Sequence, residues 1–176
     1  MSGIPPPYLV VPVTEAPAQR ITISLGLQSC VIRLYTKSTN EPAHDPDEIP
    51  TDPHPRYENV NPVFVDLYTD SGATLIVGGV YVRHGSLIVR DTYLGFSGDL
   101  AVYDTSGAGE YPVGVPPRLP PLYLRSEAQR EAYPLSLGNM APPNVAGRIP
   151  GMGSRFILTY WPPGSYTPGY SIPIGP

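Results

Sequence analysis

Proline limits what this chain can fold into more than any other feature. The sequence holds 25 prolines and 18 glycines among 176 residues. Because proline has a fixed backbone angle and no amide hydrogen, it is excluded from helix interiors and central strands. Regular structure must therefore lie between the prolines. We expect much of the remaining chain to be turn, edge or extended loop.

The first proline-free stretch predicts a β-hairpin over about residues 20–37. Ile21, Ile23 and Leu25 alternate with polar residues, which is the period-two pattern of a strand with one buried face. Residues 26–29 can turn, and the alternation then resumes from Cys30. We interpret Cys30 as a small core residue and not as a reactive thiol.

Two further stretches predict strands, over about residues 63–104 and 154–161. In the second stretch, Asp70–Gly72 supplies turn chemistry, and Gly78–Gly79 predicts a bend or bulge. In the third stretch, the alternating residues Phe156, Leu158 and Tyr160 share one face. Closely spaced strands of this kind are typical of a small antiparallel β-barrel or sandwich. We therefore expect a single all-β domain over residues 1–176.

Long proline-rich segments separate these strands. Residues 38–62 and 106–153 are predicted loop insertions, and residues 162–176 form an extended apolar tail. Within the second insertion, Ser126 as N-cap and Pro134 as terminator predict one short helix. Because an apolar tail would be sticky in water, we expect it to pack along a neighbouring molecule.

The sequence offers little catalytic chemistry. Its three histidines lie in predicted loops or at a predicted turn, and the sequence contains no nucleophile elbow, phosphate-binding loop or dinucleotide fingerprint. One acidic segment could in principle gather around a metal, through His44, Asp45, Asp47, Glu48, Asp52 and His54. Its spacing matches no known ligand pattern. We predict no enzyme activity, no cofactor and no metal. We expect Asp91 and Asp99 to cap turns or to pair with Arg83 or Arg90.

Charge and composition narrow the class of partner. The net charge of −4 argues against nucleic acid, and no apolar run approaches the roughly 20 residues that would span a membrane. The first 13 residues lack a basic leader and contain prolines, so we expect no signal peptide. The 13 tyrosines suit half-buried strands and wet protein interfaces. A carbohydrate- or receptor-binding module is the alternative, but it needs an aromatic platform, and the tyrosines are scattered along the sequence.

Several motifs, taken in order, resemble the baseplate plug proteins of Pam3-like contractile-tailed cyanophages. The matching strand positions are Ile21, Ile23 and Leu25, followed by the run RLYTK that ends at Lys37. The hairpin positions are Asp66, Tyr68, Asp70, Gly72, Leu75 and Gly78, then Tyr93, Leu94, Gly95, Gly98 and Leu100. The last positions are Gly151, Gly153, Ser154, Arg155, Phe156, Leu158 and Tyr160. The resemblance covers roughly half the chain. The segments 38–62, 106–153 and 162–176 appear as additions to that family's pattern.

The resemblance implies a structural protein of the virion, made in the host cytoplasm and placed in a contractile tail baseplate. It would lie near the central hub and tail tube as a plug, or alternatively act as a tube initiator or sheath-side linker. Its partners would be other baseplate, hub and tube proteins, and copies of itself in a symmetric ring. The interface residues we predict are Trp161, Tyr166, Tyr170, Ile172 and Tyr160. Phe156 is a further candidate contact, with plain core as its alternative role.

Overall fold

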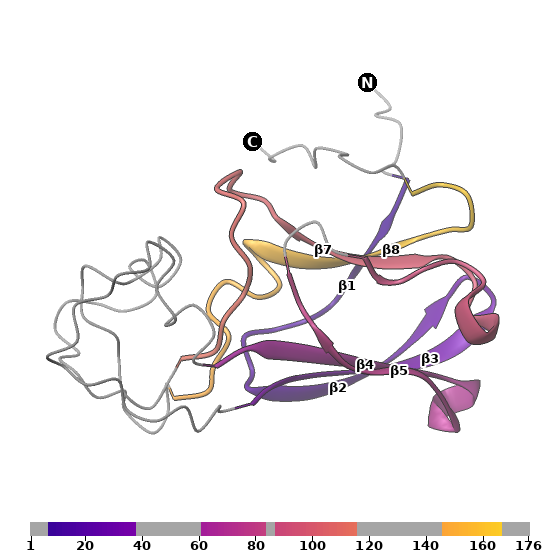
Figure 1. Cartoon of the computed structure of the whole chain (residues 1–176), viewed down its shortest axis with the longest axis horizontal. Helices are drawn as coiled ribbons and strands as arrows, with labels where there is room; N and C mark the ends of the chain where they lie inside the picture. Colours follow the sequence, from indigo (N-terminus) through magenta and orange to yellow (C-terminus); the bar gives the residue numbers. More distant parts are fainter. Residues whose placement is uncertain (1–6, 38–60, 84–86, 116–145, 167–176) are drawn as a thin grey trace, which may run out of the picture.

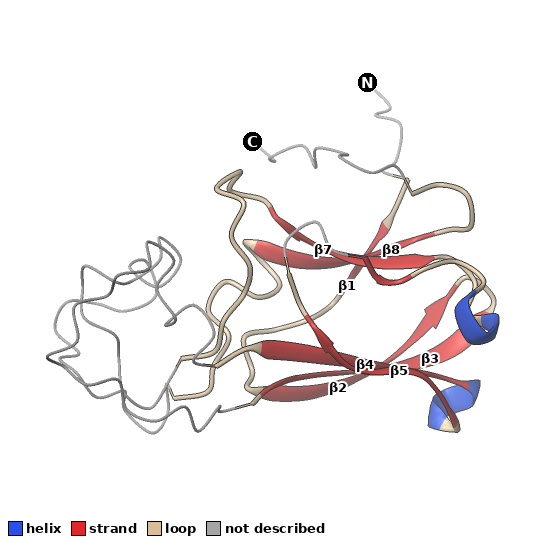
Figure 2. Cartoon of the chain, in the orientation of Figure 1, coloured by secondary structure: helices blue, strands red, loops and turns tan. Residues whose placement is uncertain are grey.

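The computed structural model describes residues 7–37, 61–83, 87–115 and 146–166. These residues form two four-stranded antiparallel sheets that lie one above the other as a β-sandwich (Figures 1 and 2). The all-β prediction is confirmed. The predicted helix after Ser126, the acidic segment around His44 and most of the tail lie outside the described residues.

Sheet B is formed by the first predicted strand block and the first part of the second. Its order is β2 (Ala18–Leu25), β3 (Gln28–Thr36), β4 (Val63–Thr69) and β5 (Thr74–Tyr81). Leu25 pairs with Gln28, so a two-residue turn joins β2 to β3, and Gly26 adopts the positive φ of +62° that this turn requires. A short 3₁₀ turn, η2 (Asp70–Gly72), joins β4 to β5 where the sequence predicts a turn.

The predicted bulge in β5 is confirmed. Val65 of β4 pairs with Val80 of β5, and Leu67 pairs with Val77. Asp66 is therefore the one residue of β4 that faces both Gly78 and Gly79. The amide of Gly79 turns toward Asp66 and donates to its Oδ1 atom at 2.7 Å. A bulge of this kind bends the strand and increases its twist.

Sheet A joins segments that are far apart in the sequence. Its order is β1 (Leu9–Val11), β8 (Phe156–Trp161), β7 (Asp99–Asp104) and β6 (Leu87–Val89). A second 3₁₀ turn, η3 (Tyr93–Gly95), lies between β6 and β7. The predicted block 63–104 is thus divided between the two sheets. We did not predict β1, because three residues between prolines carry too little alternation to identify a strand.

The main core fills the space between the sheets. Phe156 and Leu158 face inward and are fully buried, as the alternation of β8 predicts. Cys30 also lies in this core, where burial raises the pKa of its thiol. This agrees with its interpretation as a core residue. Residues 105–115 then run from the end of β7 toward sheet B, where Val113 forms a bridge with Pro62 (Figure 1).

Candidate interaction surfaces

Two of the predicted interface residues lie inside the chain's own core. Tyr160 is 3% exposed, packs edge-on against Phe96 and donates its hydroxyl to the carbonyl of Ser97 at 2.9 Å. Trp161 is fully buried and belongs to a second, smaller core cluster. The structure therefore corrects the prediction that these two side chains are available to a partner. Phe156 is also fully buried in the main core, which was the alternative to an interface role for this residue.

Trp161 is buried because the outer face of sheet A is covered. The ring of Tyr8, which precedes β1, lies 5.0 Å from the Trp161 ring, and the ring of Tyr166 lies 5.5 Å from it on an edge. The indole nitrogen donates to Thr159 Oγ1 at 3.0 Å, and Thr159 donates in turn to the carbonyl of Ala101. Residues from both ends of the described chain thus seal this face.

Tyr166 is half-buried against Trp161, so its described contacts are within the chain, and its interface role stays a prediction. Tyr103 lies beside it, and burial, followed by the charge and hydrogen bond of Tyr166, raises the pKa of Tyr103 well above its usual value. Tyr170 and Ile172 lie outside the described residues. The sequence did not predict this arrangement, because the alternating pattern of β8 gives no sign that Tyr8 and Tyr166 cover its outer face.

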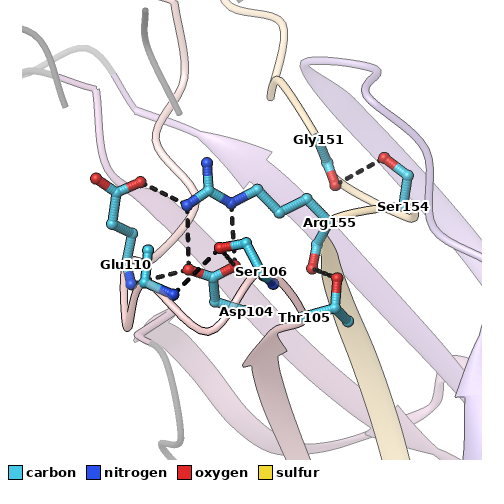
Figure 3. A network of polar contacts seen from close by, with 8 residues as sticks. Asp104, Thr105, Ser106, Glu110, Gly151, Ser154 and Arg155 are labelled. Carbon is cyan, nitrogen blue, oxygen red and sulfur yellow. Dashed lines mark hydrogen bonds and ion pairs between the residues drawn. The ribbon is translucent and has the colours of Figure 1, made fainter. Parts of the chain in front are cut away.

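A charged network joins the end of β7 to the start of β8 (Figure 3). The Asp104 side chain is fully buried and lies against Arg155, which donates from Nε to Oδ1 at 3.0 Å and from Nη2 to Oδ2 at 3.2 Å. Nη2 also donates to Glu110 Oε2 at 2.8 Å. Ser106 contributes its amide and its hydroxyl to Asp104 Oδ1, and the Glu110 amide donates to Oδ2.

The Asp104–Arg155 pair is a brace and not a reactive centre. Burial alone would raise the pKa of Asp104, but the hydrogen bonds from Arg155, Ser106 and the amide of Glu110 outweigh it and lower the pKa to about 2. A carboxylate held ionised in this way by several donors is a poor general base and cannot act as an acid at neutral pH. The network fastens two strands that are 51 residues apart in the sequence.

The Asp104 carboxylate makes stability depend on pH in a defined window. Its folded pKa of about 2 lies below the ordinary value of 3.8, so ionised Asp104 contributes about 2 kcal/mol to the free energy of unfolding. The contribution is fully present above pH 3.8 and is lost as the pH falls through 2. We expect urea unfolding at about pH 5 and about pH 2 to show this loss in the natural chain. Asp104→Asn should lose about 2 kcal/mol less over the same interval; equal losses would contradict the assignment.

The outer face of sheet B carries an aromatic row that the sequence analysis missed. Tyr35, Phe64 and Tyr81 are direct cross-strand partners on β3, β4 and β5. Their ring centroids lie 5.9 Å and 6.0 Å apart, and Tyr111 continues the row at 5.8 Å from Tyr81. The tyrosines are scattered along the sequence, but the structure corrects the inference that they form no aromatic platform. Their alignment depends on strand register, which the separation of residues along the sequence does not reveal.

A charged row lies beside the aromatic one. Arg20 of β2 and Arg33 of β3 are directly opposite each other, and Asp66 of β4 is opposite Arg33. Arg33 Nη1 lies 3.8 Å from Asp66 Oδ2, while Asp66 Oδ1 accepts from Tyr35 and from the amide of Gly79. A third row, formed by Thr22, Val31, Tyr68 and Leu75, completes the face.

A shallow concavity of ≈ 520 Å³ opens on this face. Its lining comes from all three rows and from the η2 turn, and it includes Ala18, Arg20, Arg33, Tyr35, Tyr68 and Gly72. The hydrogen bond and charge of Tyr68, and after them the charge on Asp66, raise the pKa of the Arg33 guanidinium, which is charged in any case. The concavity has the volume of an ordinary ligand site.

One end of the sandwich exposes large apolar side chains. Leu27 at the β2–β3 turn is fully exposed, and Leu94 and Tyr93 in η3 are 66% and 50% exposed. Gln28 links the two segments, because its side chain donates to the carbonyl of Gly95 at 2.7 Å and accepts from the amide of Ser97 at 2.8 Å. We call Leu27, Tyr93 and Leu94 the apolar tip.

The expected turn roles of two acidic residues are confirmed. Asp91 Oδ1 accepts from the amide of Gly98 at 2.7 Å, and Asp99 Oδ1 accepts from the amide of Asp91 at 3.1 Å. Within the described ranges, no group of histidine, cysteine, aspartate or glutamate side chains is placed to hold a metal ion. No helix among these residues is long and apolar enough to cross a membrane.

No protein-family model, no curated protein and no solved structure matches this chain. Any function must therefore be argued from its sequence motifs, its fold and the surfaces described above.

Proposed function

We propose that this protein is a non-catalytic structural component of a contractile phage tail baseplate, placed as a plug near the central hub and tail tube. The sequence motifs that resemble baseplate plugs supply the biological setting. The structural support is the apolar tip, because three large apolar side chains are exposed together at one end of the sandwich, and exposed apolar side chains gathered in one patch mark a candidate contact with a partner.

The backbone of the tip is consistent with this role. Leu94 has a φ of +47° and Thr92 a φ of +65°, both in the left-handed region that non-glycine residues avoid. Strain of this kind persists at binding and functional sites, where the surrounding structure enforces it. In the proposed assembly, the tip inserts its two leucines into an apolar pocket of a neighbouring baseplate protein.

A double variant, Leu27→Ser with Leu94→Asn, should separate binding from folding. Asparagine tolerates the left-handed region better than leucine, so the free chain should be as stable as the natural one or more stable by about 1 kcal/mol. Incorporation into tails should fall at least tenfold, because the tip loses its apolar contacts. Quantitative mass spectrometry of purified tails measures incorporation, and urea unfolding measures stability.

The control is Leu75→Ser, which removes a leucine that is 51% exposed and lies over Gly78 on the outer face of sheet B. It should leave incorporation within twofold. Cryo-electron microscopy of tails from the phage that encodes this chain then distinguishes a plug from a tube initiator or a sheath-side linker. Absence of the natural chain from those tails would overturn the proposed function, and an unchanged level of the double variant would overturn the role of the tip.

A further inference from the structure

We infer that the concavity on the outer face of sheet B is a binding site for an acidic sugar, a pyranose that carries a carboxylate. The inference does not rest on the proposed baseplate role. It starts from the Arg20–Arg33 pair, because like charges placed directly opposite on neighbouring strands destabilise a sheet.

The pair carries more positive charge than the face neutralises. Among the residues that the structure describes, Arg33 has one ion-pair partner, Asp66 at 3.8 Å, and the Oδ1 atom of Asp66 already accepts from Tyr35 and from the amide of Gly79. Arg20 has no ion-pair partner among the residues that the structure describes, although the whole chain carries a net charge of −4. An uncompensated arginine in a concavity of an acidic protein favours an anionic ligand.

The position of the Arg20 side chain suits the binding of an anionic ligand in the concavity. Its Nη2 atom lies 3.3 Å from the point that a Cβ atom on Gly72 would occupy, and Val31 Cγ2 lies 3.4 Å from the same point. The guanidinium therefore lies beside the η2 turn and close to the buried Val31, where it is exposed to solvent and accessible to a ligand. Two planar guanidinium groups over one concavity offer the paired donors that recognise a carboxylate.

The flanking rings select a sugar over a bare anion. Tyr35 and Tyr68 line the concavity on either side of the arginine row, and each offers a flat apolar face, while their hydroxyls are held by Asp66 and Arg33. A pyranose matches this combination, since it has an apolar ring face, hydroxyl groups and, when acidic, one carboxylate. The aromatic row from Tyr35 to Phe64 and Tyr81 extends the same platform for a second sugar unit.

Other ligand classes fit less well. A nucleic acid strand would bring a continuous run of phosphates to a protein of net negative charge. A protein partner is anchored most strongly by a side chain buried in a deep apolar pocket, whereas this concavity is shallow and has charged arginines in its lining. The protein-contact alternative is kept as an outcome of the test.

The test is isothermal titration calorimetry of the full chain with oligosaccharides of galacturonic, glucuronic and sialic acid, each beside its methyl ester. At least one acid should bind, and its ester should bind at least tenfold more weakly, because charge-assisted hydrogen bonds to a carboxylate are lost. Arg20→Gln should weaken binding of the acid at least tenfold without lowering stability, since it relieves the repulsion with Arg33. Tyr68→Ala should also weaken it.

Arg90→Gln is the matched control, since Arg90 is an exposed arginine that follows β6 in the other sheet, and it should change the affinity less than twofold. Equal binding of acid and ester, or an Arg20→Gln variant that binds normally, overturns the proposed site. Failure of all three acids overturns the sugar proposal. If Arg20→Gln then also reduces incorporation into tails, the face is a protein contact. Absence of the chain from tails overturns only the baseplate role, because calorimetry on the purified chain is independent of it.

Discussion

Replacing Arg155 with methionine is expected to lower the free energy of unfolding by about 3–5 kcal/mol, because it leaves the Asp104 carboxylate buried without its cation. Methionine keeps most of the apolar length that packs near Phe156, whose ring lies 5.1 Å from the guanidinium carbon. The decrease in the free energy of unfolding therefore comes mainly from the lost positive charge and not from lost apolar packing. Urea unfolding followed by the fluorescence of Trp161, the sole and fully buried tryptophan, measures it.

The matched control is Arg148→Met. Arg148 also makes an ion pair at 2.9 Å, with Glu15, but both side chains are about half exposed. An exposed pair of this kind contributes at most about 1 kcal/mol, so the control should lose no more than that. The double variant Arg155→Met with Asp104→Asn should recover at least about 1 kcal/mol relative to Arg155→Met alone, because it buries no charge. Equal losses in Arg155→Met and Arg148→Met would contradict the role of the network as a buried brace.

The sequence predicted the strands well where they are long and alternating. The hairpin over residues 20–37, the Gly78–Gly79 bulge and the inward face of β8 all appear, since each depends on local spacing alone. Of the strands that the structure describes, the one missed is β1, which is held in sheet A by pairing with the distant β8 and not by a pattern of its own.

The surfaces were predicted poorly, because they depend on register and on contacts between distant segments. Tyr35, Phe64 and Tyr81 become neighbours only after β3, β4 and β5 have paired. The burial of Trp161 depends on Tyr8, from the other end of the described chain. No sequence pattern paired Asp104 with Arg155, because their contact requires β7 and β8 to be adjacent. A single sequence carries no record of such contacts.

The structure explains why a glycine stands at position 98, one of the motif positions. It has a φ of +105°, and a Cβ atom added there would collide with the ring of Tyr160 and lie 2.5 Å from the carbonyl oxygen of Trp161. The Tyr160 ring cannot move aside without breaking its hydrogen bond to the Ser97 carbonyl, and the Trp161 carbonyl, at the end of β8, cannot move without disturbing the pairing of Trp161 with Asp99. Glycine is thus required here by both conformation and space.

Gly98→Ala is therefore expected to lower the free energy of unfolding by about 3–5 kcal/mol, which combines the cost of a left-handed alanine with that of overpacking. Gly95→Ala is the matched control, because Gly95 also has a positive φ, +84°, but has open space where a Cβ atom would lie. It should lose only about 1–2 kcal/mol, the conformational cost alone. The difference between the two variants in urea unfolding isolates the collision with Tyr160 and Trp161. A Gly98→Ala variant no less stable than Gly95→Ala would mean that β8 does not press against the β6–β7 turn as described.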